Sequence, residues 1–104
     1  MEVVANLVPD SGMAVSFHVL PAILDLTQAQ KLRDTMLHAL DGGPVTLDAG
    51  EVDRMSTPCI QVILAAGRAA EAENIRFKVR NATLVFQKAF ADLGLGQELS
   101  NWTN

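Results

Sequence analysis

The sequence is poor in the residue types on which several classes of site depend. It has one cysteine, one tryptophan and no tyrosine in 104 residues. A lone cysteine cannot form an internal disulfide, which favours a reducing compartment. Base stacking on nucleic acids needs aromatic side chains beside a dense basic surface. The chain has only four phenylalanines and one tryptophan, and its twelve Asp and Glu residues outnumber its eight Lys and Arg residues. We therefore expect no nucleic-acid binding.

Long apolar runs and targeting signals are also missing. No apolar run approaches the roughly 20 residues that a membrane-spanning helix needs. The first twelve residues have no basic stretch and contain Glu2, unlike a secretory signal. Apolar residues nevertheless make up 49% of the chain, which is typical of a globular protein. The sequence therefore predicts a single domain over residues 1–104, cytoplasmic and without membrane insertion.

Short apolar stretches alternate with helical patterns along the chain. We expect a strand or loose arm in residues 1–14, an edge strand at 14–20 and a short strand at Ile23–Leu24. A helix follows from Thr27, with Gln30 completing a capping box, and ends at residues 41–44. The remaining expected elements are a strand at 44–49, a helix at 57–73, a strand at 75–79, a helix capped by Asn81 and ended by Gly94, and a tail at 96–104. This order predicts an α/β fold.

The stretch Ser56-Thr57-Pro58 supports two interpretations. Thr57 can be the N-cap of the second long helix, with Pro58 as its first residue, because proline lacks the N–H that would be unpaired there. Alternatively, a hydroxyl at a helix N-terminus is well placed to carry a phosphate, since backbone N–H groups and the helix dipole favour negative charge. Spacing alone does not separate these interpretations.

Other residues with reactive side chains fit structural roles better. Cys59 falls in the first turn of that helix and could act as a nucleophile only if the fold brings His18 or His38 to it. The two histidines lack the spacing of metal ligands. The acidic residues after the third expected strand are typical of a solvated loop, and the glycines follow helices rather than forming a phosphate loop. The sequence predicts no catalytic residue, cofactor site or metal site.

Three stretches resemble the STAS domain of bacterial anti-sigma factor antagonists. They are AILDLTQAQKLRDTML, PVTLDAGEVDRMSTPCIQVILAAGRAAEAEN and IRFKVRNATLVFQKAFADLGL, which together cover most of residues 15–95. The likeness lies in spacing more than in identity. It implies a mixed β-sheet of about four to five strands, covered by three or more α-helices.

The resemblance also implies a function. In that family a partner kinase, which is also the anti-sigma factor, phosphorylates a serine or threonine at the start of the second helix, and the phosphate breaks the complex. By position Thr57 matches the phosphoacceptor, with Ser56 as the less favoured candidate. Ser56 replaces the aspartate that precedes the acceptor in the family, and Cys59 stands where glycine or a small residue is usual. The implied partner-binding residues are Asp48, Arg54, Met55, Ser56, Thr57, Pro58, Cys59 and Gln61.

Three functions are therefore considered. The first is a non-enzymatic interaction domain that binds a kinase or anti-sigma factor under control of Thr57 phosphorylation. The second is a constitutive adaptor without phosphorylation, on a chemotaxis kinase array or a lipid-transport ATPase. The third is a small enzyme that uses Cys59 as its nucleophile.

Overall fold

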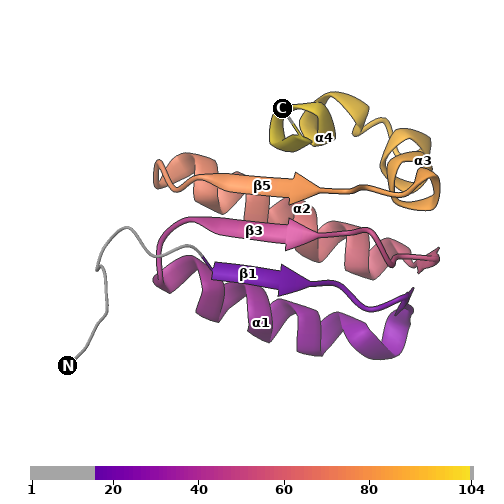
Figure 1. Cartoon of the computed structure of the whole chain (residues 1–104), viewed down its shortest axis with the longest axis horizontal. Coiled ribbons are helices and arrows are strands. Elements are labelled where there is room, and N and C mark those ends of the chain that lie inside the picture. Colours follow the sequence, from indigo (N-terminus) through magenta and orange to yellow (C-terminus); the bar gives the residue numbers. More distant parts are fainter. Residues whose placement is uncertain (1–15, 104) are drawn as a thin grey trace.

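The centre of the fold is a three-stranded parallel sheet, seen in a computed structural model that describes residues 16–103 (Figure 1). Its strands are β1 (Ser16–Val19), β3 (Val45–Asp48) and β5 (Phe77–Arg80), in the order β1-β3-β5. Two further strands, β2 (Ile23–Leu24) and β4 (Arg54–Met55), form a separate two-stranded parallel sheet. The strand or arm expected at residues 1–14 lies outside the described residues.

Four α-helices complete the fold, and they lie on one side of the sheet. Helix α1 (Ala29–Asp41) follows a short 3-10 helix, η3 (Leu26–Gln28), and packs beside α2 (Thr57–Ala72). Helices α3 (Leu84–Asp92) and α4 (Gly96–Thr103) lie at the β5 edge (Figure 1). None of the helices formed by residues 16–103 has the length and apolar character needed to span a bilayer.

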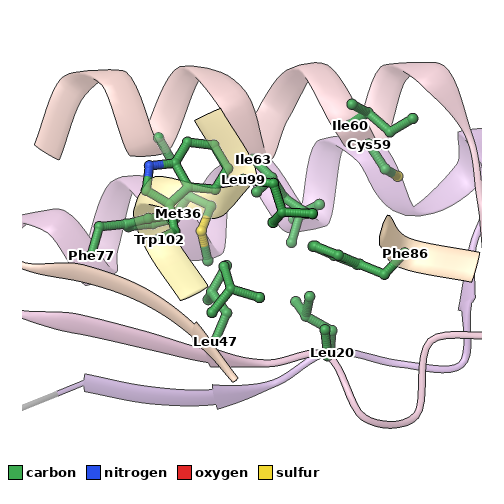
Figure 2. Close-up of a cluster of buried hydrophobic side chains, with 14 of the residues drawn as sticks. Leu20, Met36, Leu47, Cys59, Ile60, Ile63, Phe77, Phe86, Leu99 and Trp102 are labelled. Carbon is green, nitrogen blue, oxygen red and sulfur yellow. The ribbon is translucent and has the colours of Figure 1, made fainter. Parts of the chain in front are cut away.

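The alternation of side chains along the strands decides which face of the sheet is covered. On β3 and β5 the side chains of Val45, Leu47, Phe77 and Val79 are buried, and the residues between them are more exposed. Because successive side chains of a strand point to opposite faces, the buried ones share the helical side. Figure 2 shows the resulting core between the helices and the sheet, with Leu20, Met36, Leu47, Cys59, Ile60, Ile63, Phe77, Phe86, Leu99 and Trp102 labelled.

Helix α4 replaces the tail that we expected at residues 96–104. Leu99 and Trp102 are its buried residues, and the Trp102 ring makes edge-on contacts with Phe77 and Phe90, at centroid distances of 5.2 and 5.9 Å. The ring also lies against Gly67 of α2, where any side chain would overlap it. The C-terminal residues are therefore part of the core.

The sheet arrangement differs from the mixed sheet of four to five strands that the resemblance implies. Over residues 16–103 all strand pairs are parallel, and five strands divide into two sheets rather than one. The division arises because β2 and β4 are each two residues long and pair only with each other. The α/β class and the covering helices are confirmed.

The predicted start of the first helix is wrong. Instead, the carboxylate of Asp25 accepts hydrogen bonds from the backbone N of Thr27 at 3.0 Å and from the Thr27 hydroxyl at 2.5 Å. These bonds form the η3 turn, and α1 begins only at Ala29. The Gln30 side chain donates to Asp34 rather than completing a capping box with Thr27.

The cap of the third long helix is also corrected. Thr83, not Asn81, is the N-cap of α3, and its hydroxyl accepts from the backbone N of Phe86 at 3.2 Å. The same hydroxyl donates to the carbonyl oxygen of Val52 at 2.8 Å. Asn81 lies two residues earlier with a φ of 58°, a left-handed conformation that asparagine tolerates better than most residues. Its amide donates to Asp48.

Candidate functional site

The stretch from Arg54 to Gln61 occupies one continuous place in the fold, comprising β4 and the first turns of α2. Strand β4 pairs with β2, with Ile23 opposite Arg54. Beyond this pair, the backbone N of Ser56 donates to the carbonyl oxygen of Leu24 at 2.8 Å. These bonds hold the start of α2 at the end of the molecule where the parallel strands end (Figure 1).

Ser56 is the N-cap of α2, which corrects the prediction that Thr57 takes that position. Its backbone is extended, with φ −94° and ψ 156°, and its carbonyl oxygen accepts from the N of Ile60 at 3.0 Å. The side chain makes no capping hydrogen bond. Its Oγ is buried and has no partner among the described residues. The Ser56 hydroxyl is therefore withdrawn from solvent without stabilising the helix end.

Thr57 is the first residue of α2 and is exposed to solvent. The first residues of a helix have backbone N–H groups without intrahelical partners, and a helix N-terminus carries a partial positive charge. At α2 no side chain of residues 16–103 caps these groups, and Pro58 contributes no N–H. The N–H groups of Thr57 and Cys59 remain as donors near the Thr57 hydroxyl. Of the two neighbouring hydroxyls, only that of Thr57 combines exposure with this electrostatic setting.

Cys59 belongs to the core rather than to the contact surface on which it was expected. It is 0% exposed, and its thiol donates to the carbonyl oxygen of Asp25 at 3.3 Å. His18 is paired instead with Ser16, at 2.9 Å between the ring Nε2 and the hydroxyl, and His38 is exposed on α1. No group of three or more metal-ligating side chains occurs within residues 16–103. The nucleophile hypothesis gains no geometric support.

Asp48 has a structural role at this end of the sheet. One carboxylate oxygen accepts from the backbone N of Gly50 at 2.8 Å, and the other accepts from the Asn81 amide at 3.3 Å. These two bonds join the connection after β3 to the connection after β5. Asp48 therefore fixes the loop that leads to β4, and both its oxygens are engaged by the protein itself.

The other expected contact residues differ in exposure. Arg54 and Gln61 are exposed, and Met55 and Pro58 are half-buried. Met55 packs against the core. Partner contacts are therefore available mainly to Arg54, Thr57 and Gln61, with the edges of Met55 and Pro58.

Four exposed apolar side chains that were not predicted as contact residues lie on elements next to this stretch. They are Ile23 in β2 (40% exposed), Leu26 in η3 (69%), and Leu84 and Val85 at the start of α3 (81% and 39%). Helix η3 contacts α2, and α3 contacts β4. The signal available in the sequence was weak: Leu26 and Leu84 each stand beside a capping residue, off the apolar faces of the helices.

Comparisons with known proteins give one finding. No curated protein and no solved structure matches the chain. A family model described as "Mlab, STAS domain" matches residues 19–100, which includes β2, β4 and the whole of α2. The matched region is most of the chain, and the chain therefore belongs to the STAS domain family.

Proposed function

We propose that this protein is a non-enzymatic interaction domain of bacterial signalling, which binds a regulatory kinase or anti-sigma factor through β4 and the start of α2. STAS domains generally mediate protein–protein interactions rather than catalysis. We further propose that phosphorylation of Thr57 controls this binding and that the unphosphorylated form is the one that binds.

The observation that carries the proposal is the difference between two adjacent hydroxyls. Thr57 is exposed at the uncapped N-terminus of α2, whereas the Ser56 Oγ is buried without a partner. A kinase needs an accessible acceptor, and Thr57 meets that requirement without unfolding of the helix start.

The exposed apolar side chains on the neighbouring elements support the same location. Ile23, Leu26, Leu84 and Val85 expose apolar surface on β2, η3 and α3, the elements that contact β4 or α2. Exposed apolar surface that is concentrated in one region is typical of an interaction site. A phosphate on Thr57 would place roughly two negative charges there. A partner packed against this surface would have to desolvate the phosphate, which accounts for dissociation.

The test is phosphorylation of the full chain by the kinase encoded next to its gene, with ATP, followed by mass spectrometry. We expect one phosphate, on Thr57, and loss of kinase binding in the modified protein. Thr57→Ala should abolish the modification and keep binding. Ser56→Ala is the matched control and should be modified like the natural protein. Absence of phosphate from Thr57 while binding persists would show that the switch is wrong.

A second candidate function is a constitutive adaptor on a chemotaxis kinase array or a lipid-transport ATPase. Two features of the α2 start favour it: Ser56, in place of the family's aspartate, makes no capping bond, and Pro58 removes one backbone donor. Both features weaken a site for holding phosphate. An adaptor of this kind should bind its partner equally well as Thr57→Ala and Thr57→Glu. The switch instead predicts a loss of affinity of at least about tenfold for Thr57→Glu alone.

A further inference from the structure

A groove lies between α1 and α2 on the outer surface of the molecule. It has a volume of about 500 Å³, and every lining residue within the described part of the chain belongs to these two helices, so it opens away from the sheet. Its lining is mainly apolar and includes Leu37 and Leu40 of α1 and Val62, Ala65 and Ala69 of α2. Leu37 is 53% exposed. Apolar surface therefore remains unpaired along the line where the two helices meet.

The dimensions of the groove fit a third helix. Its lining residues recur every three or four positions, from Pro58 to Ala69 on α2, which corresponds to roughly 17 Å along the helix axis. This distance equals about three helical turns. Ala65 and Ala69 are small and exposed, so a helix in the groove can approach the α2 backbone closely.

The charge of the groove defines the occupant further. Of the described residues that line it, Arg33 is the one charged residue, and none is a carboxylate. Among residues 16–103 Arg33 makes no ion pair, whereas Arg68 is engaged by Glu98. An occupant with a carboxylate facing Arg33 would satisfy this cation, and a basic occupant would be disfavoured.

We propose that this groove binds an amphipathic acidic helix of the partner protein. Leu37, Val62 and the two alanines would receive the apolar face of that helix, and Arg33 would receive a carboxylate, in the helix-in-groove mode of recognition. The inference rests on the proposed function, because Pro58 lies both at one end of the groove and next to Thr57. The partner held at Thr57 would extend along α1 and α2 by this helix.

The test uses the full chain, labelled with ¹⁵N, and a synthetic peptide of about 14 residues, roughly 21 Å long as a helix. Leucines at helical spacing form its apolar face, and glutamates form the other face. A second peptide has lysine in place of each glutamate. We expect the acidic peptide to shift the amide signals of α1 and α2 along the groove, and to bind several-fold more tightly than the basic peptide.

Two pairs of variants separate the groove from general effects. Ala69→Arg should fill the groove and weaken binding of the acidic peptide at least about tenfold. Ala91→Arg changes another exposed helical alanine, on α3, and should leave binding of the peptide unchanged. Arg33→Glu should weaken it similarly, whereas Lys31→Glu on the same helix should have a much smaller effect. Circular dichroism must show that all four variants fold.

Three results would overturn the inference: shifts that map elsewhere or are absent, equal binding by Ala69→Arg and Ala91→Arg, or a concentration-dependent dimer that Ala69→Arg abolishes. The last result would assign the groove to a second copy of this chain. These outcomes are distinguishable from failure of the switch. If the peptide does not bind while Thr57 phosphorylation still controls the kinase complex, only the groove assignment is wrong.

Discussion

Replacing Gly67 by alanine should destabilise this protein, although alanine is the better helix former. Gly67 lies inside α2, where Gly→Ala normally stabilises a helix by about 1 kcal/mol. Here a Cβ would overlap the ring of Trp102, at 2.5 Å from Cε2 and 2.9 Å from Cη2 and in contact with Cζ2. Carbon atoms normally pack at roughly 3.5–4.0 Å. The ring or the helix must therefore move.

Neither the ring of Trp102 nor helix α2 can move easily. Trp102 is 8% exposed and is held by Phe77 and Phe90 on other sides of its ring. Overpacking of this kind typically costs about 1–3 kcal/mol, and complete loss of a buried tryptophan contact costs about 3–5 kcal/mol. After subtraction of the helix-propensity gain of about 1 kcal/mol, we expect Gly67→Ala to lower the free energy of unfolding by up to about 2 kcal/mol if the ring stays in place, and by about 2–4 kcal/mol if the ring is displaced from the core.

The chain contains its own probe for this experiment. Trp102 is the single tryptophan and tyrosine is absent, so tryptophan emission reports the packing of α4 alone. Urea unfolding should be followed by that emission and by circular dichroism. Gly96→Ala is the matched control, because no atom lies within 4 Å of a Cβ added there. It should change the stability by less than about 1 kcal/mol.

A double-mutant cycle tests the cause. In a Trp102→Ala background the overlap is gone, so adding Gly67→Ala should become neutral or stabilising by about 1 kcal/mol. If Gly67→Ala alone were as stable as the natural protein and its tryptophan emission were unchanged, the packing of α4 on α2 would differ from that described. If the effect persisted without Trp102, its origin would lie within α2.

Two further predictions concern the contacts that hold α3 and α4. Arg68 donates two hydrogen bonds to Glu98, at 2.9 and 2.6 Å, and this contact lowers the pKa of Glu98 below its ordinary value of 4.5. The pair should therefore stabilise the fold above that value and lose its contribution as the pH falls through the lowered pKa of Glu98. The difference in unfolding free energy between the natural protein and Glu98→Gln should then shrink on acidification from pH 7. A difference that stayed constant with pH would contradict the pairing. Thr83→Ala removes the α3 cap to Phe86 and the bond to Val52, and should cost about 1–2 kcal/mol in urea unfolding, with Thr83→Ser restoring most of it.

Local pattern was sufficient to predict the long elements of this fold. The helix expected at residues 57–73 is Thr57–Ala72, and Asn74, two residues beyond its end, has a φ of 59° that does not continue a helix. The expected strands at 44–49 and 75–79 became Val45–Asp48 and Phe77–Arg80. These elements carry apolar repeats long enough to be recognised within their own sequence.

Elements that depend on distant partners were not predictable in the same way. Helix α4 has a buried face because Trp102 fits over a glycine of α2, and a short segment shows no sign of that partner. The start of α1 at Ala29 has a local cause, because the Asp25 carboxylate binds Thr27 two residues away, and the Asp25 carbonyl also accepts from the distant Cys59 thiol. Strands β2 and β4 are too short to show any alternation.

The candidate site shows the same division between local and distant causes. The sequence placed two hydroxyls at a helix start, but their exposure depends on where the helix begins relative to β4. Because the backbone N of Ser56 donates to Leu24 of β2, Ser56 remains extended and its side chain is buried. The helix then begins at Thr57, the residue that was expected to cap it, and Thr57 is exposed. A hydrogen bond between β2 and the residue after β4 thus decides which hydroxyl a kinase could reach, which is why Thr57 rather than Ser56 carries the proposed switch.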